Sequence, residues 1–167
     1  MFRSLVLIAC LIAATYAFET GAPVGVCENM TPKHGVDPQT KPSPYTVTLS
    51  TDSIHAGDKV KVTLEGKNGE GFKGFLLMAR DKLNKPVGSF MVDSNDAEIQ
   101  PLDCPEGKNN AVTHRNPKDK TKISVYWTIP SDALSNSPTT VIFKATMVKN
   151  GGEFWVGQPS EPLTIHQ

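Results

Sequence analysis

The segment Phe72–Arg80 has the sequence FKGFLLMAR, and it decides the fold of the chain. Residues 75–79 within it are all apolar. A continuous apolar run of this length is typical of a strand with two buried faces, because a solvent-exposed face would place polar residues at every second position. The segment therefore predicts a central strand with cover on both sides of its sheet.

Shorter segments on either side alternate between apolar and polar residues, as expected for strands with one buried face. The clearest is Ile123–Ile129, whose odd-numbered positions are apolar and include Trp127, which we expect in the core. The other candidate strands are 45–50, 60–64, 87–92, 111–114, 139–148, 153–157 and 163–165. Seven to nine short strands without a helical period predict an all-β chain that forms an antiparallel sandwich.

The segment that precedes these strands, residues 18–44, contains five prolines and three glycines. Proline has no backbone N–H to donate to a helix or a sheet, so we predict an irregular, extended arm. Cys27 lies within this arm and could fasten it to the body of the domain.

The first seventeen residues have the pattern of a secretory signal peptide. Arg3 precedes an apolar run at 5–14, and small residues at 15 and 17 complete the cleavage pattern. The alternative, a transmembrane anchor, needs about 20 apolar residues, roughly twice this run. We therefore expect residues 1–17 to be removed, leaving a single secreted domain, 18–167, with no membrane span.

The number of cysteines also fits an extracellular, oxidising compartment. Cys10 would leave with the signal peptide, so Cys27 and Cys104 remain as an even pair in an oxidising environment, where a disulfide is the usual outcome. Closing so long a loop should stabilise the fold by roughly 4 kcal/mol. Two free thiols are the alternative, and metal ligation is disfavoured because no Cys-x-x-Cys or His-x-x-x-His spacing occurs.

The overall charge excludes one class of partner. Without Arg3, the 17 basic residues fall to 16 against 17 acidic ones, a net charge of about −1. Such a chain has no long-range attraction to nucleic acid or to anionic lipid. We expect no nucleic-acid partner, and any ligand must be recognised by local contacts.

Several motifs in order along the chain resemble the reeler (reelin N-terminal) domain. Phe72–Arg80 is similar to the most characteristic strand of that family. The other motifs are Gly21-Ala22-Pro23, Cys27, Met30, Pro32, His34-Gly35, Ser43-Pro44-Tyr45, Val87-Gly88-Ser89-Phe90, Cys104, Val112-Thr113-His114, Trp127 with Pro130, and Val141–Ala145. The resemblance implies an immunoglobulin-like sandwich with a Cys27–Cys104 bridge.

A single domain of this kind behind a signal peptide resembles small insect defence proteins, including the nodulation-mediating type. That resemblance implies a secreted monomer that binds bacterial or fungal surface polymers (lipopolysaccharide, lipoteichoic acid, glucan) and engages blood cells. The alternative is an extracellular matrix-type module that binds host proteins or glycans. Fold resemblance alone does not choose between them.

The densest basic run is a candidate binding site for the phosphates of such polymers. It comprises Arg115, Lys118, Lys120 and Lys122, interrupted by Asp119. Cations of this kind give local, salt-sensitive binding. The alternative is a charged loop and strand edge that discourages sheet-to-sheet aggregation.

Two further side chains are candidate ligand contacts. Phe154 and Trp155 are neighbours in a predicted strand, so their rings point to opposite faces, and an exposed Trp155 could stack on a sugar. Its alternative role is a cross-strand packing contact. His114 lies near the expected disulfide loop, where it either contacts a ligand or serves packing and hydrogen bonding.

Other chemistry finds little support in the sequence. No Gly-x-Ser-x-Gly elbow occurs, and the four histidines (34, 55, 114 and 166) fall singly on different predicted elements. We therefore expect no enzyme activity, no metal and no cofactor. Asn29-Met30-Thr31 is an N-glycosylation sequon in a secreted loop, so Asn29 is a candidate modification site.

Overall fold

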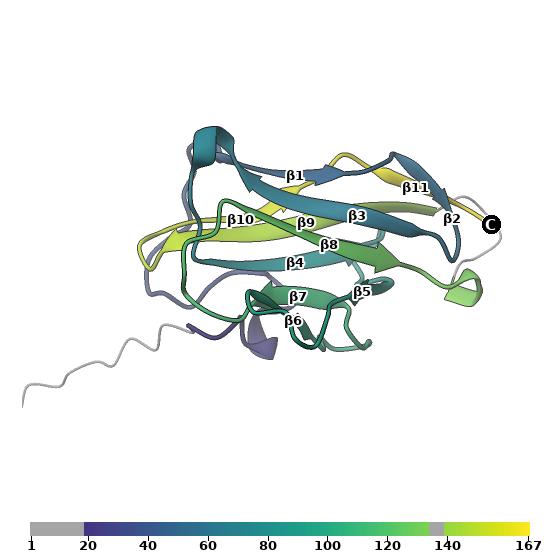
Figure 1. Ribbon diagram of the computed structural model, residues 1–167, viewed down its shortest axis with the longest axis horizontal. Helices are drawn as coiled ribbons and strands as arrows, with labels where there is room; N and C mark the ends of the chain where they lie inside the picture. Colours follow the sequence, from purple (N-terminus) through teal and green to yellow (C-terminus); the bar gives the residue numbers. More distant parts are fainter. Residues whose placement is uncertain (1–18, 134–138) are drawn as a thin grey trace, which may run out of the picture.

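The computed structural model describes residues 19–133 and 139–167. The predicted signal peptide, residues 1–17, therefore lies outside the described residues. The described chain is a β-sandwich of two sheets (Figure 1). Its strands are β1 (Tyr45–Leu49), β2 (Ser53–His55), β3 (Lys59–Gly66), β4 (Gly74–Arg80), β5 (Ser89–Met91), β6 (Ile99–Leu102), β7 (Ala111–His114), β8 (Lys122–Thr128), β9 (Thr139–Asn150), β10 (Glu153–Pro159) and β11 (Leu163–His166). The helical turns are three 3-10 segments, η1 (Val24–Val26), η2 (Lys67–Gly69) and η3 (Ser131–Ala133).

The first sheet has four strands in the order β1-β3-β8-β5. The second has seven, in the order β2-β11-β9-β4-β7-β6, with β10 also paired to β9. The long strand β9 pairs with β4 along one edge and with both β11 and β10 along the other. As the apolar run predicted, β4 is central, and every residue of it is buried.

The eleven strands include a counterpart for each of the nine predicted ones, and β2 and β6 are additional. Strand β2 has only three residues and pairs in parallel with β11, so the antiparallel prediction has this one exception. Strand β6 contains Pro101, but β6 lies at the edge of its sheet and pairs only with β7. An edge strand tolerates a missing backbone donor.

The main core lies between the two sheets. Trp127 of β8 is fully buried, as predicted, and its ring meets Phe143 of β9 edge-on with centroids 5.2 Å apart. The indole Nε1 of Trp127 donates to the carbonyl oxygen of Val87 at 3.1 Å, so its one polar group is satisfied. Aromatic pairs in this geometry add to the energy of apolar burial.

A second, smaller core lies on the outer face of the second sheet. There Leu76 and Met78 of β4 pack against Val26 and Met30 of the N-terminal arm. Figure 1 shows the arm, coloured purple, alongside β6 and β7. The disulfide between Cys27 and Cys104 joins the arm to the segment after β6. The two buried faces of β4 are therefore covered by different partners, the first sheet on one side and the arm on the other.

Candidate functional site

The N-terminal arm is held to the sheet by side chains that point outward from the strands. Thr113 of β7 accepts from the Ala22 amide at 2.8 Å, and Thr146 of β9 donates to the Met30 carbonyl at 2.7 Å. The buried guanidinium of Arg80 donates to the carbonyl oxygens of Cys27 and Glu28. These hydrogen bonds satisfy backbone groups in a segment with no sheet partner of its own.

Between these anchor points the arm and the sheet enclose a groove of about 430 Å³. This volume lies within the range of small-molecule sites, about 300–1,000 Å³. Its walls are mostly apolar. The sheet contributes Gly74, Phe75, Leu76, Thr146 and Val148, and the arm contributes Gly21, Ala22, Pro23, Val26, Met30 and Pro32. The remaining lining residues are Glu19, Lys33, His34, Lys73, His114, Pro117, Asn150 and Gly151.

Gly74 helps to keep this space open. It faces outward from β4, opposite Val148, and has no side chain to fill the groove. A Cβ atom at this position would lie 3.0 Å from Cε1 of His114, so a larger residue would also have to displace that ring. A glycine inside a fully buried strand is a recognised sign that another group approaches the backbone closely. It is the one sequence signal that could have indicated the groove.

His34 of the arm lines the groove and packs edge-on against Phe154, with ring centroids 5.4 Å apart. Burial lowers the pKa of His34, so its imidazole is neutral at physiological pH. Within residues 19–133 and 139–167, its Nδ1 is the buried side-chain atom found without a hydrogen-bond partner.

His114, predicted as a candidate ligand contact, also lines the groove. Its side chain is buried, and its Nδ1 accepts from the Phe75 amide at 3.2 Å. The packing and hydrogen-bonding role therefore describes what the ring does within the fold, while contact with a ligand stays a prediction.

Of the predicted basic run, Lys120 is buried and not at the surface, while ligand binding by the run stays a prediction. That side chain is 3% exposed, and its Nζ donates to the carbonyl oxygens of Asn116 at 2.9 Å and Lys118 at 2.7 Å. A longer bond of 3.4 Å reaches the Lys73 carbonyl. Burial lowers the pKa of Lys120. The ammonium group is an internal tether for the loop that precedes β8.

The other three members of the run differ in their surroundings. Arg115 is half-buried and donates through Nε to the Ile99 carbonyl at 3.3 Å. Lys118 is exposed in the loop, and Lys122 forms an exposed ion pair with Glu65 at 3.3 Å. Of the four predicted cations, only Lys118 and Lys122 present their ammonium groups mainly to solvent.

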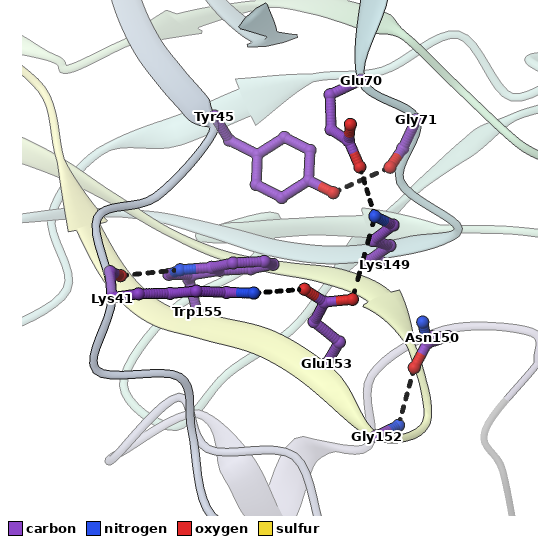
Figure 2. Close-up of polar contacts among 9 residues, drawn as sticks. All are labelled: Lys41, Tyr45, Glu70, Gly71, Lys149, Asn150, Gly152, Glu153 and Trp155. Carbon is purple, nitrogen blue, oxygen red and sulfur yellow. Dashed lines mark hydrogen bonds and ion pairs between the residues drawn. The ribbon is translucent and has the colours of Figure 1, made fainter.

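Trp155 is not an exposed platform, so that prediction is also wrong. The ring is 2% exposed, stacks edge-on with Tyr45 at 5.4 Å, and donates through Nε1 to the Lys41 carbonyl at 3.0 Å (Figure 2). Phe154, its neighbour, is buried on the opposite face, where His34 and the arm cover it. Both rings are buried because other parts of the fold pack against both faces of β10. The large aromatic side chain exposed on a sheet is instead Tyr126 of β8, which is 50% exposed.

A chain of charges fastens the end of the arm to the β9–β10 hairpin. Lys41 pairs with Glu153 at 2.9 Å, Glu153 with Lys149 at 3.8 Å, and Lys149 with Glu70 at 2.7 Å (Figure 2). The hydrogen bond from Lys41 holds the pKa of Glu153 below its usual value. Solvent screens exposed pairs of this kind, so the network positions segments and adds little to stability.

Tyr45, beside this network, donates through its hydroxyl to the Gly71 carbonyl at 2.7 Å (Figure 2). Burial, with the nearby Glu70 carboxylate, raises the pKa of Tyr45 to about 12. The phenol therefore stays protonated at physiological pH and keeps this hydrogen bond.

Asn29, the sequon residue, is exposed at the surface next to the disulfide. Its Oδ1 accepts from the Thr31 amide at 2.9 Å. Glycosylation there stays a prediction. Among the described residues, no group of three or more His, Cys, Asp or Glu side chains is placed to hold a metal ion. In the same part of the chain, no helix combines the length and the apolar character needed to cross a membrane.

Comparison with known proteins identifies the family. The model of the Reeler domain matches residues 25–167. This chain belongs to the Reeler domain family. The Reeler domain here is 41% identical over 169 residues to a Samia ricini protein named "Putative defense protein Hdd11-like", covering 99% of this chain and 98% of that one. It is 35% identical over 168 residues to the defense protein l(2)34Fc of Drosophila melanogaster, covering 99% of both chains.

The same Reeler domain also occurs inside a larger protein. Ferric-chelate reductase 1 of Bos taurus is 39% identical over 151 residues, which are 88% of this chain but 24% of that protein. This match shows a shared domain and not a shared activity. The Reelin-N domain of F-spondin has a similar fold, with a TM-score of 0.60 at 23% identity, covering 75% of this chain and 88% of that one.

Proposed function

We propose that this Reeler protein is secreted and acts in defence by binding surface components of microbes, such as lipopolysaccharide or lipoteichoic acid, and promoting their clearance by blood cells. Relatives of nearly the same length carry defence-protein names. The observation that carries the proposal is the groove under the arm, which is concave, mostly apolar and bordered by Lys33 and Lys73. Such a site suits amphiphilic molecules of microbial envelopes better than it suits a purely polar ligand.

Co-sedimentation of the mature, disulfide-intact protein with Gram-negative and Gram-positive bacteria tests this function. We expect enrichment on the cells, and competition by soluble lipopolysaccharide or lipoteichoic acid. An unrelated secreted β-sandwich of similar charge is the control. Enrichment no greater than that of the control would contradict the proposal.

A second candidate is an extracellular matrix-type module that binds host proteins or glycans. Tyr126 and Met91 lie opposite each other on β8 and β5, and both are largely exposed on the outer face of the first sheet. An exposed tyrosine on a flat sheet is a usual contact in protein recognition. Constant expression in unchallenged tissue, with host-matrix binding that Tyr126→Ala abolishes, would favour this function over defence.

A further inference from the structure

We propose that the groove between the arm and the outer face of the second sheet binds an acyl chain of a microbial glycolipid, with Lys33 and Lys73 meeting its anionic head group. This inference rests on the proposed function and names the part of the ligand that the protein holds. It also assigns the head group to lysines outside the predicted basic run, because none of that run's four cations lines the groove.

The walls of the groove match a hydrocarbon chain. The apolar lining of the groove consists of Leu76, Val26 and Met30, which pack together in the second core, with Val148 and the arm prolines Pro23 and Pro32. The backbone amide of Ala22 and the hydroxyls of Thr113 and Thr146, which lie around this space, already have hydrogen-bond partners within the fold. A sugar placed there would lose its hydrogen bonds to water and find few replacements, whereas a methylene chain loses none. The site therefore favours the lipid part of an amphiphile.

The polar ends of the groove fit an anionic head group. Lys33 and Lys73 both line it and both are exposed, so the groove is bordered by two solvated cations. One acidic residue, Glu19, also lines it. Two ammonium groups against one carboxylate favour a phosphate or carboxylate at the opening. Since the mature chain has a net charge near zero, this preference is local.

The affinity for the glycolipid should come mainly from burial of its acyl chain and not from the charges of Lys33 and Lys73. Each buried methylene contributes enough that removing two of them weakens binding by about tenfold. A ligand with the same sugars and phosphates but no acyl chains should therefore bind much more weakly.

The test compares intact lipopolysaccharide with the same material after complete deacylation, titrated into the mature disulfide-intact protein by calorimetry. We expect the native protein to bind the acylated form at least about tenfold more tightly. Val148→Trp, which fills the groove, should remove that difference. Val36→Trp makes the same substitution at an exposed arm valine outside the groove and should keep it.

Each other outcome is decisive. Equal affinity of the native protein for both forms would overturn the acyl-chain site but leave the proposed function standing. Loss of binding to both forms, together with a negative co-sedimentation result, would overturn the proposed function itself. Binding of free myristate without binding of lipopolysaccharide would overturn the microbial source. Because the comparison of ligands uses the native protein, it remains informative even if Val148→Trp fails to fold.

Discussion

At the scale of single residues, Lys120 shows how a side chain's neighbours change its role. In the sequence it belongs to a basic run, but in the fold the loop before β8 curls around its ammonium group. Backbone carbonyls of Asn116, Lys118 and Lys73 accept from it. A buried ammonium is tolerated only when such acceptors replace water. Lys120 therefore stabilises the loop and is not available to a ligand.

Replacing Lys120 should accordingly cost stability. We expect Lys120→Met to lower the free energy of unfolding by about 1–3 kcal/mol, because it leaves partly buried carbonyls without their donor. Lys118→Met, two residues away but exposed, should change it by less than about 0.5 kcal/mol. Urea unfolding curves of both variants make the comparison. Equal effects would mean that Lys120 is not the tether we describe.

His34 should make the fold sensitive to acid. Burial lowers its pKa in the folded state below the unfolded value of 6.5. Between those two pKa values the unfolded chain binds more protons at His34 than the folded chain does. The contribution of neutral His34 to stability is therefore complete above about pH 6.5 and is lost as the pH falls through the folded-state pKa. Thermal unfolding of the native protein should show this loss, and His34→Gln should show less of it. An identical pH dependence in the variant would contradict the prediction.

At the scale of elements, the arm is the unusual part of the molecule. It is not itself a strand, so its position depends on single contacts, which include the disulfide, Arg80, two threonine hydroxyls and the pairing of Lys41 with Glu153. Strand β4 needs the arm in turn, since Leu76 and Met78 would otherwise be exposed. The arm thus completes a core and forms one wall of the groove.

Removing the disulfide should release the arm before it unfolds the sandwich. We expect the Cys27→Ser/Cys104→Ser variant to lose roughly 4 kcal/mol, because the bridge closes a sequence separation of 77 residues. Limited proteolysis with mass spectrometry should find early cuts within residues 19–44 and protected strands. Cleavage spread evenly over the chain would show that the arm and the sandwich unfold together.

At the scale of the whole molecule, the near-zero net charge limits what electrostatics can contribute to binding. Of the predicted basic run, Lys120 is buried and Lys122 is paired with Glu65. The apolar groove should contribute more to binding than these cations do. The chain is therefore better suited to recognising an amphiphile than to attracting a polyanion from a distance.

Binding to lipopolysaccharide should consequently depend only weakly on salt. We expect its affinity to change by less than about tenfold between low and physiological ionic strength. Salt screens the interaction of Lys33 and Lys73 with the head group but not the burial of the acyl chain. Calorimetric titrations at the two ionic strengths measure this. A steep decline with salt would indicate binding by surface cations instead.

The sequence alone determined the strands, the sandwich and the cysteine pair. These follow from local patterns, namely the period of two, the apolar run of β4, and an even number of cysteines after an expected signal peptide. Its motifs also pointed to the Reeler family, which comparison confirmed. Strands β2 and β6 were not predicted, because a very short strand and an edge strand that contains proline give little local sequence signal.

Only the tertiary structure decided which surfaces are free. The burial of Trp155 and Lys120, and the groove with Gly74 in its wall, depend on segments far apart in the chain. The Ala22 amide, for example, meets a hydroxyl 91 residues away. The alternation along a strand tells which side chains share a face, but not what covers that face. That cover is set by long-range packing, and here the arm provides it, which is why the candidate binding site could not be found from residue patterns alone.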